Sequence, residues 1–168
     1  MDHYIKKILN ARVYDVSKET ALDVAPGLST KTGNQVLLKR EDLQPVFSFK
    51  CRGAYNRIFK LQQQYPETEG VVCASAGNHA QGVALSASRL GIKSVIVMPK
   101  TTPTIKINAV KNLGGEAVLF GDTYDEAHAH ARELEQSTGF AYIHPFNDTD
   151  TIAGQGTIGV ELLSLIHI

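Results

Sequence analysis

The sequence predicts an α/β fold with three layers, in which helices cover both faces of a parallel sheet. Strand-like and helix-like segments alternate about three times between residues 71 and 143. The strand-like segments are short apolar runs without polar alternation, as expected for strands that are buried on both faces. The loops between them are short, which favours right-handed crossovers between parallel strands.

The N-terminal third of the chain is less regular. Residues 2–12 predict an amphipathic helix. Residues 23–34 are rich in Pro, Gly, Ser, Thr and Asn and predict a loop, whereas residues 36–40 predict a strand. Ser48 is the expected N-cap of a helix that continues to residue 61.

The remainder of the chain contains the regular alternation. Strands are predicted at 71–74, 94–98, 116–120 and 140–143, and helices at 78–90, 104–113 and 123–137. Asp150 or Thr151 is the expected N-cap of a further helix that runs to Leu163. The closing residues 164–168 carry no capping or turn signal, so we expect the chain to be cut off from a longer protein.

Composition restricts the class of partner. The net charge is zero, from 17 basic and 17 acidic residues, which argues against nucleic acid or an anionic membrane as a partner. The sequence has neither a signal peptide nor an apolar run long enough to span a bilayer. Cys51 and Cys73 lack the spacing of a disulfide framework or metal site. These features predict a cytoplasmic protein with reduced thiols.

Lys50 is the first candidate for chemistry, and it lies in the segment Ser48–Ala54 (Ser-Phe-Lys-Cys-Arg-Gly-Ala). A lysine must be neutral to attack an aldehyde, so its pKa must fall below the ordinary value. Apolar Phe47 and Phe49 and the cationic Arg52 are expected to lower it. From spacing alone, an ordinary surface lysine at a helix start remains the alternative.

The second candidate is the segment Ser75–His79 (Ser-Ala-Gly-Asn-His), which lies between a predicted strand and a predicted helix. Backbone N–H groups at a helix N-terminus favour anions, and open α/β sheets bind ligands at the carboxyl ends of their strands. Ser75 is a possible cap, and Asn78 offers both a donor and an acceptor. His79 is expected to orient this loop by packing rather than to act as an acid or base. A plain capping turn remains the alternative.

Other motifs carry weaker signals. His128 and His130 are two residues apart and share no helix face, so we expect solvated rings and no metal site. His144 ends a predicted strand, and its role is open. The glycines at 154, 156 and 159 have the spacing of a nucleotide-binding fingerprint, but they do not follow a strand, so this interpretation is weak.

Taken together, these segments resemble the N-terminal part of the biosynthetic threonine ammonia-lyases (threonine dehydratases). That family uses pyridoxal 5′-phosphate (PLP) and has the tryptophan-synthase-β-like fold, also called PLP fold type II. The resemblance extends from about Tyr4 to Leu163. The motifs that carry it are Lys39–Asp42, Gln44–Val46, Ser48–Ala54, Ser75–Gly82, Val97–Pro99 and Ile152–Thr157.

The resemblance implies a lyase that converts L-threonine to 2-oxobutanoate and ammonia in isoleucine biosynthesis, with possible side activity on L-serine. Lys50 is then the catalytic residue and carries the cofactor, while Phe49 packs near it and Asn78 hydrogen-bonds its ring oxygen. The implied substrate-binding residues are Ser75, Ala76, Gly77, Asn78 and His79. The full-length protein is expected to be a homo-oligomer.

The resemblance also implies a domain plan and two departures. Residues 1–47 begin a large domain, residues 48–150 form a small α/β domain, and residues 151–168 return to the large one. The family's glycine-rich phosphate loop falls after residue 168, and Ala21 stands where the family commonly has proline. The alternatives are a folded fragment that does not bind PLP, a serine racemase, and a catabolic serine-threonine dehydratase.

Overall fold

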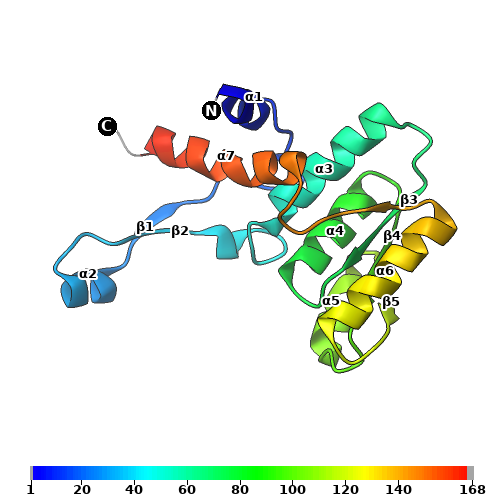
Figure 1. Ribbon diagram of the computed structural model, residues 1–168. Coiled ribbons are helices and arrows are strands. Elements are labelled where there is room, and N and C mark those ends of the chain that lie inside the picture. Colours follow the sequence, from blue (N-terminus) through cyan, green and yellow to red (C-terminus); the bar gives the residue numbers. More distant parts are fainter. Residues whose placement is uncertain (1, 166–168) are drawn as a thin grey trace.

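The computed structural model describes residues 2–165 and contains an α/β body with a parallel sheet (Figure 1). The sheet has the order β5-β4-β3-β6, and each neighbouring pair is parallel. Its strands are β3 (Gly70–Ala74), β4 (Lys93–Met98), β5 (Glu116–Leu119) and β6 (Ala141–Tyr142). The parallel sheet predicted from the apolar runs is therefore confirmed.

Helices cover both faces of this sheet, which confirms the predicted three layers. The body helices are α3 (Lys50–Gln64), α4 (Asn78–Arg89), α5 (Thr104–Asn112) and α6 (Tyr124–Thr138). Alternate residues of β3 point to opposite faces, so Val71 and Cys73 pack under α3 and α4, while Val72 and Ala74 pack under α6. Burial on both faces explains why these strands read as continuous apolar runs.

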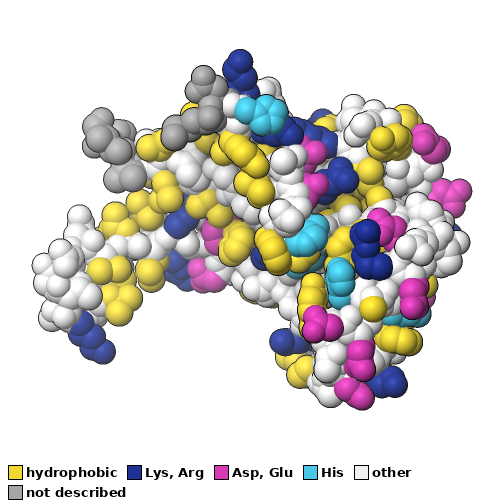
Figure 2. All heavy atoms as spheres, viewed as in Figure 1, with side chains coloured by type: hydrophobic (Ala, Val, Ile, Leu, Met, Phe, Trp, Pro, Cys, Tyr) yellow, Lys and Arg dark blue, Asp and Glu magenta, His cyan; other side chains and the backbone are white. Residues whose placement is uncertain are grey.

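A second group of elements lies outside the body. It comprises α1 (Asp2–Leu9), β1 (Leu22–Val24), α2 (Pro26–Thr32), β2 (Leu37–Lys39), the short 3-10 helix Glu41–Leu43 and α7 (Thr149–Leu165). Helix α7 lies between α1 and α3, and β1, α2 and β2 form an arm that extends away from the body (Figure 1). Hydrophobic side chains line the arm, and several of them are exposed (Figure 2).

The prediction of a loop at residues 23–34 is wrong, because this segment includes part of β1 and all of α2. Pro26 occupies the first turn of α2, and Gly33 ends the helix in the left-handed conformation with φ 64°. Proline at a helix start and glycine just after its end are normal helix boundaries. Proline and glycine are also typical of loops. In a segment without apolar periodicity, they therefore led to the wrong prediction of a loop.

Two predicted caps are also wrong. Helix α3 begins at Lys50, and Ser48 Oγ lies buried with no hydrogen-bond partner within residues 2–165. Helix α7 is capped by Asp148 rather than by Asp150 or Thr151, since Asp148 Oδ1 accepts the N–H groups of those two residues at 3.0 and 2.8 Å. Asp148 is itself a favoured N-cap residue, so only the start of α3 departs from local capping rules.

The glycine series at 154–159 lies inside α7, which excludes a nucleotide-binding turn. A Cβ atom at Gly154 would lie 2.6 Å from the Arg52 carbonyl oxygen. Glycine there allows the backbones of α7 and α3 to approach closely. Among the described residues, no helix is long and apolar enough to cross a membrane.

Candidate functional site

Lys50 is the first residue of α3 and points to the carboxyl edge of the sheet. Its side chain is partly buried, and Nζ donates a hydrogen bond to the Pro145 carbonyl oxygen at 2.8 Å. Helix α4 crosses close beside it, because a Cβ at Gly82 would lie 2.9 Å from the Lys50 carbonyl oxygen. Packing against α4 thus positions the backbone of Lys50, and the hydrogen bond to Pro145 positions its amino group.

Burial lowers the pKa of the Lys50 amino group, as its proposed chemistry requires. The Phe49 ring lies 5.5 Å from Nζ. Phe47, with φ 55°, is 76% exposed and shields little. The expectation that Arg52 helps to lower this pKa is wrong, because its guanidinium points into a buried carboxylate cluster on another side of α3.

The segment Ser75–His79 joins β3 to α4 at the same edge. The Ser75 N–H donates to the Val97 carbonyl at 3.1 Å, which continues the β3–β4 ladder into the loop. Ser75 Oγ accepts the Gly77 N–H at 3.2 Å, so it orders the turn but does not cap the helix as predicted. Gly77 is the N-cap and provides no side-chain acceptor. The first N–H groups of α4 thus have no capping side chain, an arrangement that favours a bound anion.

Asn78 and His79 point in different directions. Asn78 is the exposed first residue of α4. His79 is only 4% exposed, and its Nε2 hydrogen-bonds the Ile143 carbonyl at 2.9 Å. The His79 ring therefore ties α4 to the end of β6, in agreement with the predicted packing role. A contact between His79 and a substrate would have to use its backbone N–H.

Because the His79 ring is buried, the free energy of unfolding depends on whether this ring is protonated. Burial lowers the pKa of His79 to about 4, and the hydrogen bond to Ile143 opposes this only in part. In the unfolded chain, His79 takes up a proton near pH 6.5. The contribution of neutral His79 to the free energy of unfolding is therefore complete above that pH and is lost as the pH falls toward 4. We expect a loss of about 3 kcal/mol over this interval.

His79→Gln is the matched variant, because the Gln amide nitrogen replaces Nε2 as the donor but does not titrate. Urea unfolding between pH 7 and 4 should show a smaller loss of stability in this variant. An identical loss in both proteins would contradict the role given to His79.

The segment from Ile143 to Asp148 was not identified as part of the site from sequence. It carries the Pro145 carbonyl that receives Lys50, and His144 Nδ1 accepts the N–H groups of Phe146 and Asn147. A His-Pro pair directly after the last strand of a parallel sheet is the signal that points to this edge.

The rings of His128 and His130 pack against aromatic rings, so the prediction that both are simply solvated is wrong. The His130 ring stacks on Phe120 at 4.0 Å, and His128 lies 5.5 Å from Tyr142. Figure 2 shows histidine side chains gathered where the loop before α7 meets α6. Within residues 2–165, no group of His, Cys, Asp or Glu is arranged to hold a metal ion.

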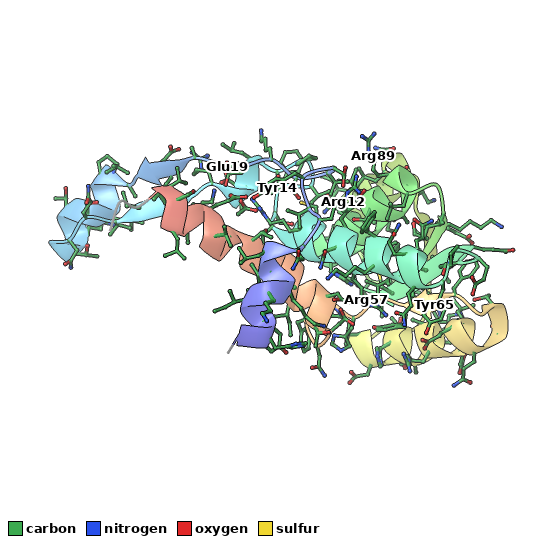
Figure 3. The ribbon with its side chains drawn as sticks, turned by 90° about the horizontal axis from the view of Figure 1, so that it is seen from above. Arg12, Tyr14, Glu19, Arg57, Tyr65 and Arg89 are labelled. Carbon is green, nitrogen blue, oxygen red and sulfur yellow. The ribbon has the colours of Figure 1, made fainter. Side chains whose placement is uncertain are left out.

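Arg52 organises the support behind the site. Its guanidinium is completely buried and donates to both carboxylate oxygens of Glu41 at 2.8 Å, and to Glu161. Lys39 also pairs with Glu161, so two cations balance two carboxylates. Tyr14, labelled in Figure 3, donates to Glu161 at 2.9 Å from the segment that follows α1. This network joins the arm, α3 and α7 around the start of the helix that carries Lys50.

The fold and the site define a class of enzyme. A lysine with a lowered pKa and a helix start whose uncapped N–H groups favour an anion both lie at the carboxyl edge of a parallel sheet, an arrangement suited to an aldehyde cofactor with an acidic group. In agreement with this, the family model described as "Pyridoxal-phosphate dependent enzyme" matches residues 13–167. The chain belongs to this family and has the type II PLP fold.

Comparisons with individual proteins point to one branch of the family. "Threonine dehydratase 1 biosynthetic, chloroplastic" from Solanum lycopersicum is 58% identical over 159 residues. That match covers 95% of this chain and 26% of the relative, so the chain spans about a quarter of the relative's length.

Solved structures show the same relationship. The processed form of threonine deaminase isoform 2 from Solanum lycopersicum has a TM-score of 0.92 and 51% identity, and the match covers 99% of this chain and 46% of that one. Maize serine racemase has a TM-score of 0.90 with 34% identity, over 96% of this chain and 50% of that one. The fold is common to both enzymes, whereas sequence identity favours the threonine enzymes.

Proposed function

We propose that this chain provides the cofactor lysine and substrate loop of an L-threonine dehydratase. The reaction converts L-threonine to 2-oxobutanoate and ammonia, with side activity on L-serine. The observation that carries the proposal is the position of Lys50, whose amino group is partly buried, has a lowered pKa and lies at the carboxyl edge of the sheet. The names of the relatives supply the substrate.

The residues present fit PLP. Lys50 would hold the cofactor through Nζ, the Phe49 ring would flank it, and the exposed Asn78 amide would hydrogen-bond its ring oxygen. When bound, PLP supplies an electron sink for the carbanion that forms at the substrate α-carbon. The fit rests on a partly buried amine whose pKa burial lowers, because a lower pKa increases the neutral fraction and only a neutral amine is nucleophilic.

Each group of the site has a task in the reaction. When it is not bonded to the cofactor, neutral Nζ of Lys50 would take the α-proton of threonine, and the Pro145 carbonyl would accept a hydrogen bond from the resulting ammonium. The start of α4 binds the substrate carboxylate, with donors from the segment of Ser75, Ala76, Gly77, Asn78 and His79. The buried His79 ring holds this segment in place through its hydrogen bond to Ile143.

The same reasoning extends to organisation. We assign residues 48–150 to a small domain, and residues 1–47 and 151–168 to a larger one. The separate sheet of β1 and β2 and the packing of α1 on α7 support this division. We also propose that the intact protein is cytoplasmic and homo-oligomeric. Neither property affects the test of the chemistry.

The test uses the purified chain with PLP at pH 8. Borohydride reduction followed by peptide mass spectrometry should place the pyridoxyl group selectively on Lys50, because its lowered pKa leaves more neutral amine than an exposed lysine has. Assays of 2-oxobutanoate from threonine and pyruvate from serine then compare substrates that differ by one methyl group, a difference worth about 1–3 kcal/mol. An adduct spread over many lysines would overturn the cofactor site. Serine racemisation faster than threonine deamination would favour the racemase alternative.

A further inference from the structure

The Pro145–Phe146 peptide unit connects His144 to Lys50. The Pro145 carbonyl oxygen accepts from Lys50 Nζ at 2.8 Å, and the Phe146 N–H donates to His144 Nδ1 at 3.2 Å. The peptide is trans, as are all peptides among the described residues. The carbonyl and N–H of one trans peptide point in opposite directions. The bond to His144 on one side therefore aims the carbonyl toward Lys50 on the other.

The ends of this loop are held by other contacts. The Ile143 N–H donates to Val72 at 2.8 Å, and its carbonyl receives His79. At the far end, Asp148 caps α7 and pairs with Arg57 of α3 at 3.1 Å (Arg57 is labelled in Figure 3). Besides the bond from Lys50 to Pro145, the hydrogen bonds in the middle of the loop, among the described residues, are those to His144 Nδ1, including the Asn147 N–H at 2.8 Å.

We propose that His144 is a positioning residue for Lys50: its unprotonated Nδ1 orients the Pro145–Phe146 peptide unit so that the Pro145 carbonyl receives the Lys50 amino group. The inference rests on the proposed role of Lys50 and adds a residue to that site. Because Nδ1 accepts two N–H groups, the ring proton resides on Nε2. An acceptor on the N–H side of the peptide, here His144 Nδ1, also polarises its carbonyl, which strengthens the bond to Lys50.

The surroundings of His144 favour the neutral ring that this role requires. Partial burial lowers its pKa, and the nearby basic side chains of His128, Arg132 and Lys50 lower it further, while Asp148 opposes them. The rings of Tyr142 and Phe146 pack against it with centroids 6.3 and 4.6 Å away. The imidazole therefore has two separable properties, an acceptor at Nδ1 and an aromatic surface.

Two substitutions separate these properties. His144→Asn keeps an acceptor at the same number of bonds from Cα, because Asn Oδ1 accepts N–H groups two and three residues ahead in the same way, but it loses the ring. His144→Phe keeps an aromatic ring and loses the acceptor. Lys106, exposed on α5 far from the loop in sequence, is the internal reference for both.

The measurement is the ratio of pyridoxyl adduct on Lys50 to that on Lys106 after incubation with PLP and borohydride reduction. We expect His144→Asn to keep the wild-type ratio and His144→Phe to lower it about threefold to tenfold, the effect of one or two lost hydrogen bonds. Wild-type ratios in both variants would overturn the inference and leave the proposed function intact. A wild-type chain without preference for Lys50 would overturn the proposed function itself, and the inference with it.

A second measurement needs no variant, in case His144→Phe does not fold. Imidazole nitrogen shifts from long-range proton–nitrogen NMR spectra of the wild-type chain at pH 7.5 distinguish the two neutral tautomers. We expect His144 to carry its proton on Nε2. A ring protonated on Nδ1 has no acceptor for the two N–H groups and would overturn the inference.

Discussion

Lys50→Ala is expected to abolish both the PLP adduct and the formation of 2-oxobutanoate. The substitution removes the only amine that the site presents beside Pro145 within the described chain, and with it the group that would take the α-proton. Loss of a positioned proton-transfer group costs about a hundredfold to ten-thousandfold in rate, and loss of the covalent attachment adds to this. Keto-acid assays and mass spectrometry after reduction measure the two effects independently.

Lys106→Ala is the matched control, because Lys106 is exposed on α5 and has no assigned role. It should change neither the adduct nor the product. Lys50→Ala should lower the free energy of unfolding by no more than about 0.5–1.5 kcal/mol, the contribution of its one hydrogen bond to Pro145. Product formation that survives in Lys50→Ala would refute the proposed chemistry.

The second large effect concerns Arg52. We expect Arg52→Ala to lower the free energy of unfolding by about 3–5 kcal/mol, because it leaves Glu41 and Glu161 buried with too little positive charge. Burial alone would raise the pKa of Glu161, but the hydrogen bonds from Arg52 and Lys39 outweigh it and lower that pKa. Without Arg52, burial favours the protonated carboxyl. Urea unfolding at pH 7 measures the loss.

Arg40→Ala provides the comparison for an arginine at the surface. Arg40 pairs with Asp23 and Asp42 at 2.7 and 2.8 Å, but all three side chains are accessible to water. Such pairs contribute about 0–1 kcal/mol. If Arg52→Ala cost no more than Arg40→Ala, the buried network would not be the connection between the arm, α3 and α7.

Local sequence was sufficient to predict those elements that depend on the pattern of neighbouring residues. The apolar runs around Val72 and Val97 predicted buried parallel strands, and the motif around Lys50 indicated the family to which the chain belongs. Local sequence misled where a boundary depends on distant partners. Ser48 is a good N-cap by residue type, yet its hydroxyl lies buried while α3 starts two residues later. Pro26 and Gly33 suggested a loop, although they bound a short helix.

The sequence by itself determined the fold class and the family and singled out Lys50 as the candidate lysine, because periodicity and motif order are properties of neighbouring residues. Only the tertiary structure decided what surrounds that lysine. Arg52, two positions away, turns into a buried network with Glu161, which is 109 residues distant, while Pro145, 95 residues distant, receives Nζ. Parallel strands and the helices between them bring such separated segments to one edge of the sheet. The spacing of residues along the chain does not predict which side chains make contact there.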